Sequence, residues 1–410
     1  MKKLLNNKSA LLLWGARSFS RFGDSLEMLA LLYLVYDLTG SGLAMGSLML
    51  FSVLPNAIIS PFAGVLADKY DKKKIMFLGE MVRGIAIAII PILMITETIH
   101  LWHIYLISVL VSIAESFFEP AAGTTFVLVV GREDMPLFNS VVTISNHIMR
   151  VLGFSLSGII MATIGKEIIF VVDAVTFLAS GVIALMVKIP DMKKEKSEEV
   201  SDFKKELLSG FNYVLENKVI MSIIVVIIFI QFFQTPLDTY IPLIIEKVLL
   251  VPTVWSGYFA TATIIGAIIG NVLYPFLNKT SMKLYHLYLY GIAILGVSIG
   301  LCGFILTPIY YVFMFFVLGV VGSLISTWSF TEIQLLVDTN YLGRVSSILI
   351  MISLISTPLA GVVFGGLADI IYIPQILKGL GAIWLVVSLL SSFLIRKNSK
   401  HSIKVKNFEY

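Results

Sequence analysis

Long apolar runs separated by short polar breaks occupy almost the whole sequence. A helix that crosses the hydrocarbon core of a membrane needs about 20 mostly apolar residues. Charge clusters, Gly, Pro and Asn divide the chain into twelve such runs. They are residues 10–36, 42–67, 75–96, 102–130, 137–164, 167–188, 219–246, 254–277, 284–306, 309–337, 343–371 and 374–395. Because backbone polar groups in lipid must bond within their own segment, we expect each run to be a helix.

The composition supports a membrane protein. Hydrophobic residues make up 58% of the chain and charged residues 14%, against about a quarter charged in a soluble domain. The single cysteine, Cys302, excludes a disulfide framework. The N-terminus resembles a short signal, but Arg17 and Arg21 follow without a small-residue cleavage site, so we interpret it as the first membrane helix. The predicted fold class is therefore all-α integral membrane.

Lys and Arg predict the orientation. With the N-terminus in the cytoplasm, 23 of the 30 basic residues fall in inner segments, and only Lys166, Lys247 and Lys378 fall in outer loops. Inner loops are enriched in Lys and Arg, so both termini are predicted to be cytoplasmic, in a multi-pass protein of the cell membrane. The net charge of +4 then reflects topology, and nucleic acid is not an expected partner.

A polar segment divides the predicted spans into two sets of six. We expect an N-terminal bundle at 1–187, a cytoplasmic linker at 188–218 with an amphipathic helix, a C-terminal bundle at 219–396 and a cytoplasmic tail at 397–410. The halves also look related, since Gly64 aligns with Gly270 and Lys73 with Lys279 at one offset. A duplicated bundle of this kind places a substrate site between its halves, near the membrane midplane.

The stretch GVLADKYDKKK lies between the second and third runs. Its position and spacing resemble the loop signature of the major facilitator superfamily. The positions that match in identity or charge are Gly64, Asp68, Lys69, Lys72 and Lys73, whereas Asp71 replaces the usual Gly. The stretches ESFFEPAAGTTFVLV, RVLG (150–153) and FVVDAVTFLAS resemble the branch that contains macrolide efflux proteins and the enterobactin exporter.

The resemblance implies a secondary transporter that works by alternating access and exports a hydrophobic or amphipathic compound against proton entry. It also implies a gate, in which Asp68 meets the N-terminal end of the eleventh span near Arg344 when the inner side is shut. Arg150 matches a family arginine. No phosphate-binding loop for ATP occurs, so energy has to come from an ion gradient or from the substrate's own gradient.

Ionisable residues inside spans are costly and are therefore candidates for function. In the first span Arg21 and Asp24 are three residues apart and can pair. The candidates for proton coupling are Asp24, Glu27, Glu115 and Arg150. The alternative is structural: ion pairs within the bundle, Arg17 reaching the inner surface, Glu80 pairing with Arg83, and Asp173 in a structural position near the outer end.

Further polar and aromatic residues in the spans are candidates for a substrate cavity, since ligand pockets combine apolar walls with a few polar groups. These candidates are Arg21, Glu119, His147, Gln231, Gln234, Asp238, Trp328 and Glu332.

Other functions stay open. A proton-coupled uptake permease for a metabolite would look similar in sequence, and a non-transporting membrane sensor is a further alternative. Nothing in the sequence indicates an enzyme, a cofactor or a metal centre. The expected partners are a small-molecule substrate, protons and the lipid bilayer, with a monomeric chain.

Overall fold

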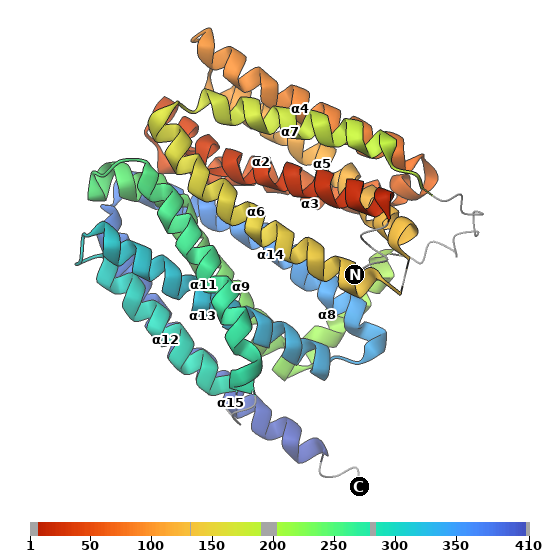
Figure 1. Ribbon diagram of the computed structural model, residues 1–410. Helices are drawn as coiled ribbons and strands as arrows, with labels where there is room; N and C mark the ends of the chain where they lie inside the picture. The colour runs from red at the N-terminus through yellow and green to blue at the C-terminus, as the bar shows by residue number, and fades with distance from the viewer. Residues whose placement is uncertain (1–6, 132, 190–202, 279–283, 407–410) are drawn as a thin grey trace. The chain divides into compact units, whose positions relative to one another are not determined.

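The computed structural model describes residues 7–131, 133–189, 203–278 and 284–406, and these are helical almost throughout (Figure 1). Among the described residues, ten helices are long and apolar enough to cross a membrane. The predicted all-α class is therefore confirmed. The number of twelve spans and the side of the membrane on which the termini lie stay predictions.

Two compact units divide the chain. Unit 1 comprises residues 1–193 together with the short segments 251–261 and 361–366, and unit 2 comprises 194–250, 262–360 and 367–410. The predicted boundaries of the two bundles, the linker and the tail stay predictions.

Unit 1 contains six long helices. They are α2 (Lys8–Thr39), α3 (Gly42–Lys69), α4 (Lys72–Ile95), α5 (Leu101–Val130), α6 (Met135–Thr163) and α7 (Glu167–Met186). Helix α4 packs along α7 and α5, α3 packs along α5, and α2 packs against α6 and α7 (Figure 1). Many large apolar side chains face outwards, such as Ile85 and Ile92 of α4, which are more than half exposed and suit contact with lipid.

Local sequence signals set the ends of these helices. Asn7 and Ser41 cap α2 and α3, their side chains accepting hydrogen bonds from backbone N–H groups. Gly40 ends α2 in the left-handed conformation, with φ of 62°. Asp71 caps α4, since its Oδ1 accepts a hydrogen bond of 2.9 Å from the Lys73 backbone N–H. An acid in the GVLADKYDKKK stretch thus begins the helix that follows.

Unit 2 is also helical. Its main elements are α8 (Phe203–Glu216), α9 (Lys218–Thr239), α10 (Ile241–Leu243), the π-helix η1 (Ile244–Leu249), α11 (Val254–Asn278), α12 (Leu284–Cys302), α13 (Pro308–Leu336), α14 (Thr339–Ile370) and α15 (Ile373–Lys406). Helix α12 packs along α15, and α9 packs against α13 and α15. The run predicted as one span at 219–246 is broken near Tyr240, because Pro242 has no N–H to continue the helix ladder.

The contact between α2 and α7 depends on Gly23. A Cβ atom at this position would fall well inside contact distance of Asp173 Oδ1 and Thr176 Oγ1. By contrast, a Cβ at Gly15 of the same helix would meet nothing within 4 Å. The lack of a side chain at Gly23 therefore lets two buried polar groups of α7 lie directly on the α2 backbone.

Gly23→Ala is expected to destabilise the protein by about 1–3 kcal/mol, because overpacking forces the two helices apart. Gly15→Ala is the matched control and is expected to be neutral or to stabilise by up to ~1 kcal/mol, from helix propensity alone. Thermal unfolding of the purified variants in detergent measures both effects. Equal melting temperatures for the two variants would contradict the proposed role of Gly23.

Candidate functional site

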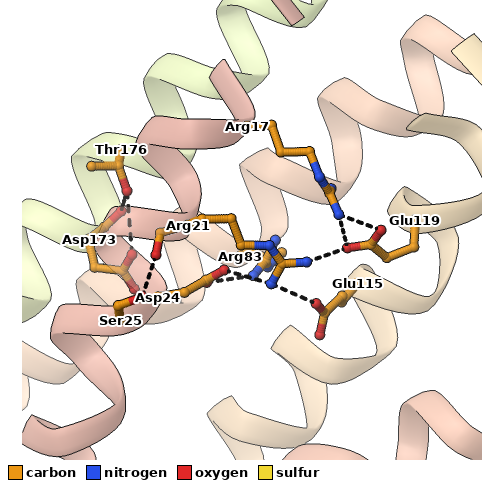
Figure 2. A network of polar contacts seen from close by, with 9 residues as sticks. All are labelled: Arg17, Arg21, Asp24, Ser25, Arg83, Glu115, Glu119, Asp173 and Thr176. Atoms are coloured by element: carbon orange, nitrogen blue, oxygen red, sulfur yellow. Dashed lines mark hydrogen bonds and ion pairs between the residues drawn. The ribbon is translucent and has the colours of Figure 1, made fainter. Parts of the chain in front are cut away.

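Helix α2 carries Arg17, Arg21, Asp24 and Glu27 within an arc of roughly 120° on one face. Arg17 Nη2 lies 2.8 and 2.7 Å from the two carboxylate oxygens of Glu119 on α5 (Figure 2). Arg21 Nη2 donates a 2.7 Å hydrogen bond to Glu119 Oε1. A carboxylate on a neighbouring helix therefore binds Arg17, and its place near the inner surface stays a prediction.

Arg21 contacts more than one acid. Its Nη1 lies 3.2 Å from Asp24 Oδ2, as the three-residue spacing predicted, and 3.7 Å from Glu115 Oε1. With the bond to Glu119, one guanidinium therefore serves three carboxylates (Figure 2). A small displacement of Arg21 would change which of these acids is neutralised.

Asp24 is also bound by Arg83 of α4, whose Nη2 lies 2.9 Å from Asp24 Oδ1. Arg83 is 4% exposed, and its guanidinium carbon lies 3.9 Å from the centre of the Phe177 ring on α7. The predicted pairing of Arg83 with Glu80 is wrong, because Asp24 takes the guanidinium instead. Neither carboxylate oxygen of Glu80 has a hydrogen-bond partner among the described residues, although the side chain is fully buried.

Asp173 of α7 completes a cluster of three acids. Single carboxylate oxygens of Asp24, Glu27 and Asp173 lie within 4.8 Å of one another. Glu27 is 7% exposed and Asp173 is 0% exposed. Thr176 Oγ1 donates to the Asp173 backbone carbonyl at 2.8 Å, and within the described part of the chain Asp173 Oδ2 has no hydrogen-bond partner. The sequence contained one signal for this, an acid in the apolar run FVVDAVTF, but nothing that linked it to α2.

The balance of charge differs between the two parts of this network. Arg17 and Arg21 match Glu115 and Glu119 in number. In the other part, four acids surround one arginine: Asp24, Glu27, Glu80 and Asp173 with Arg83. Unpaired charge is costly in a low-dielectric interior, and buried acids escape the cost by taking up a proton or by binding a cation. Asp24 already bonds to two arginines through its two oxygens, which leaves Glu27, Glu80 and Asp173 to be neutralised.

Several predicted residues lie outside the network. His147 and Arg150 lie on α6, where Arg150 is exposed and its guanidinium lies 5.9 Å from the centre of the Phe154 ring. Lys73 Nζ donates a 3.4 Å hydrogen bond to the Leu185 carbonyl. The guanidinium of Arg344 lies 5.3 Å from the centre of the Tyr341 ring. The side chain of Asp68 is not among those described.

Unit 2 contains a pocket of about 270 Å³ between α9, α11 and α13. Its lining residues are Ile227, Ile230, Gln231, Gln234, Thr263, Ala267, Leu318, Gly319, Gly322, Ser323, Ile325, Ser326, Ser329 and Phe330. Gln231 and Gln234 therefore line the same pocket, and their role in binding a substrate stays a prediction.

The other cavity candidates of the second half are placed differently. Trp328 is 4% exposed and is not part of the pocket wall. Its Nε1 lies 3.3 Å from Glu332 Oε1, so the two side chains bind each other along α13. The side chain of Asp238 lies outside the described residues.

The chain belongs to the Major Facilitator Superfamily, whose family model matches residues 13–361. The uncharacterized MFS-type transporter YfiS of Bacillus subtilis is 25% identical over 352 residues, which cover 83% of this chain and 82% of the relative. Macrolide efflux protein A of Streptococcus pyogenes is 20% identical over 360 residues, or 87% of this chain and 88% of the relative. The resemblance to the macrolide-efflux branch is thus confirmed, and the chain is a multi-pass membrane transporter.

Solved structures show the same fold. The crystal structure of the nucleoside transporter NupG matches with a TM-score of 0.72 at 14% identity, covering 98% of this chain and 100% of that one. A bacterial homologue of the iron transporter ferroportin, in an inward-facing state, matches with a TM-score of 0.71 at 16% identity, covering 95% and 98%. At these identities the likeness concerns the fold. Proteins of this family are in general transporters and not enzymes.

Arg83→Met is expected to destabilise the protein by about 3–5 kcal/mol, because it removes the buried cation that binds Asp24 across two helices. Adding Asp24→Asn is expected to restore part of this loss, since it removes the carboxylate charge that Arg83 no longer balances. Thermal unfolding in detergent measures the change.

A surface ion pair in the same unit is the control. Lys166 pairs with Asp37, whose side chain is 46% exposed. Asp37→Asn is expected to cost no more than about 1 kcal/mol, because solvent screens exposed pairs. If Arg83→Met and Asp37→Asn cost the same, the buried pair does not hold these helices together.

Proposed function

We propose that the protein exports hydrophobic or amphipathic small molecules, drugs among them, across the cell membrane in exchange for protons. The observation that carries the proposal is the excess of buried carboxyl groups over arginines around Asp24, Glu27 and Asp173. The similarity to macrolide efflux protein A supports the efflux direction and the class of substrate.

A proton-coupled exporter needs acids that are protonated in one conformation and ionised in another. Apolar surroundings favour the neutral form of a carboxyl group, and a nearby guanidinium favours the ionised form. Arg21 contacts Asp24, Glu115 and Glu119, so its movement during alternating access would leave one acid unpaired and ready to take a proton. We assign proton coupling to Asp24, Glu27 and Glu115. Arg150 of α6 is a further candidate, because its positive charge would favour the ionised form of a nearby acid and so the release of its proton.

Neutralising the acids of α2 tests the coupling. Asp24→Asn or Glu27→Gln is expected to abolish proton movement driven by erythromycin in proteoliposomes, because an amide side chain cannot release a proton. A pH-sensitive dye inside the vesicles reports the flux. Asp37→Asn, an exposed change on the same helix, is the control and should retain normal flux.

Wild-type proton flux in both Asp24→Asn and Glu27→Gln would overturn the assignment. The direction of transport is measured in inverted membrane vesicles. An exporter in inverted membrane vesicles accumulates the drug when the interior is acidified, whereas an uptake permease loses it. A sodium gradient in place of the pH gradient distinguishes a proton from a metal cation as the coupling ion.

We also propose a gate at the loop between α3 and α4. An acid at the end of a helix contributes nothing to a positive inner loop, whereas it can bind the positive N-terminal end of another helix. Gly64, Lys69, Lys72, Lys73 and Arg344 would form the rest of this gate.

Asp68→Asn is expected to leave expression unchanged and to reduce the rate of drug efflux at least about tenfold, whereas Lys72→Gln has a smaller effect because neighbouring lysines retain the positive charge. Efflux of a radiolabelled macrolide from intact cells measures both. Equal and small effects of the two substitutions would reduce the loop to a topology signal.

A further inference from the structure

The pocket in unit 2 has one polar side and one apolar side. Gln231 and Gln234 lie three residues apart on α9 and so face the same way. Ser323 and Ser326 of α13 and Thr263 of α11 add hydroxyl groups. Apolar side chains complete the wall: Ile227, Ile230, Leu318, Ile325 and Phe330. The lining therefore offers both hydrogen-bond donors and acceptors beside an apolar surface.

None of the described lining residues carries a charge. An ion that entered this pocket would lose water without gaining a counter-charge, at a cost of several kcal/mol. A neutral amide or hydroxyl group would exchange its hydrogen bonds with water for bonds to the glutamine amides at little cost. The pocket therefore selects against charge.

Gly322 keeps the space in front of Gln234 open. A Cβ atom at Gly322 would lie 3.7 Å from both Nε2 and Oε1 of Gln234, which is ordinary contact, and any longer side chain would extend into the pocket. The pocket has a volume of about 270 Å³. This holds a ring with its substituents, but it is smaller than the 300–1,000 Å³ typical of sites for whole drug-sized ligands.

We infer that this pocket binds an uncharged portion of the transported molecule that bears amide or hydroxyl groups on an apolar ring. The inference rests on the proposed function for its link to transport, but binding can be tested without transport. It names a substrate class: molecules with a neutral, hydrogen-bonding part, whatever charge the remainder carries.

Thiol labelling tests the charge selectivity. The only native cysteine, Cys302, is 0% exposed, so Ser326→Cys introduces one accessible thiol into the pocket wall. The purified full chain in nanodiscs is treated with neutral methyl methanethiosulfonate or with its cationic trimethylammonium-ethyl analogue. The control is Ser140→Cys, an exposed position on α6. The ratio of neutral to cationic labelling rates is expected to be at least about tenfold higher for Ser326→Cys than for Ser140→Cys.

Ligand protection tests the chemical class. Chloramphenicol, a small neutral amide with hydroxyl groups, is expected to slow labelling of Ser326→Cys, whereas the permanent cation tetraphenylphosphonium is not. Gly322→Leu should abolish this protection by filling the pocket, and Gln234→Leu should weaken it by removing the amide at similar volume. Gly379→Leu is the matched control, because a Cβ there would meet nothing within 4 Å.

Equal rate ratios at the two thiols would overturn the inference, as would protection by tetraphenylphosphonium equal to that by chloramphenicol. Protection that survives both Gly322→Leu and Gln234→Leu would also overturn it. These measurements need no ion gradient. Failure here leaves proton-driven export standing. Wild-type proton flux in Asp24→Asn and Glu27→Gln, which would overturn the assignment of proton coupling, does not affect the labelling.

Discussion

The bond between Arg83 and Asp24 constrains how three helices of unit 1 pack. A guanidinium with 4% exposure is tolerable only if a carboxylate meets it, and the carboxylate comes from a different helix. The face of the Phe177 ring supports the same cation from a third helix. Helices α2 and α4 therefore have to pack in one register, since a shift of one residue in either would separate the two charges, and a shift of α7 would remove the ring from the guanidinium.

Because Asp24 binds Arg83, the other acids near this arginine have no cation in the described part of the chain to balance their charge. Once Arg83 has been used for Asp24, the nearby acids Glu27, Glu80 and Asp173 have no cation of their own among the contacts described. A structure built only for stability would replace them by apolar residues, because such replacements often stabilise. The proposed proton exchange would give these acids a role, because they could bind and release positive charge. The pocket in unit 2 has the opposite character, because its described lining offers amides and hydroxyls and carries no charge. Separate chemistries for the coupling ion and for the transported molecule suit a transporter that handles varied molecules with one ion.

Local signals in the sequence predicted what depends on neighbours along the chain. Apolar runs predicted most of the helices to within a few residues, but the run at 219–246 is broken and the last helix continues to Lys406. The spacing of Arg21 and Asp24 predicted their contact. The partner of Arg83 could not be found this way, because Asp24 is 59 residues away and Glu80 is only three. Spacing along the sequence shows which ion pairs can form within one helix. The packing of the helices decides which ion pairs do form. The cluster with Asp173 and the pocket at Gln231 and Gln234 needed the same tertiary information. Trp328 and Glu332 illustrate the converse, since their spacing of one helical turn lets them bind each other.

The GVLADKYDKKK stretch contains two acids, Asp68 and Asp71, whose local environments differ. Asp71 accepts a hydrogen bond from the backbone N–H of Lys73 and so begins α4. This local bond explains why an acid can stand where the family pattern has Gly: a capping side chain replaces the conformational freedom that Gly would supply. Asp68 lies in the last turn of α3, where the negative C-terminal end of the helix dipole disfavours an acid. An acid at such a position is favourable only if a positive group from another part of the chain binds it. The replacement of the family's Gly by Asp71 therefore does not bear on the gate proposed at Asp68. Capping of α4 explains the first residue, and it does not involve the second.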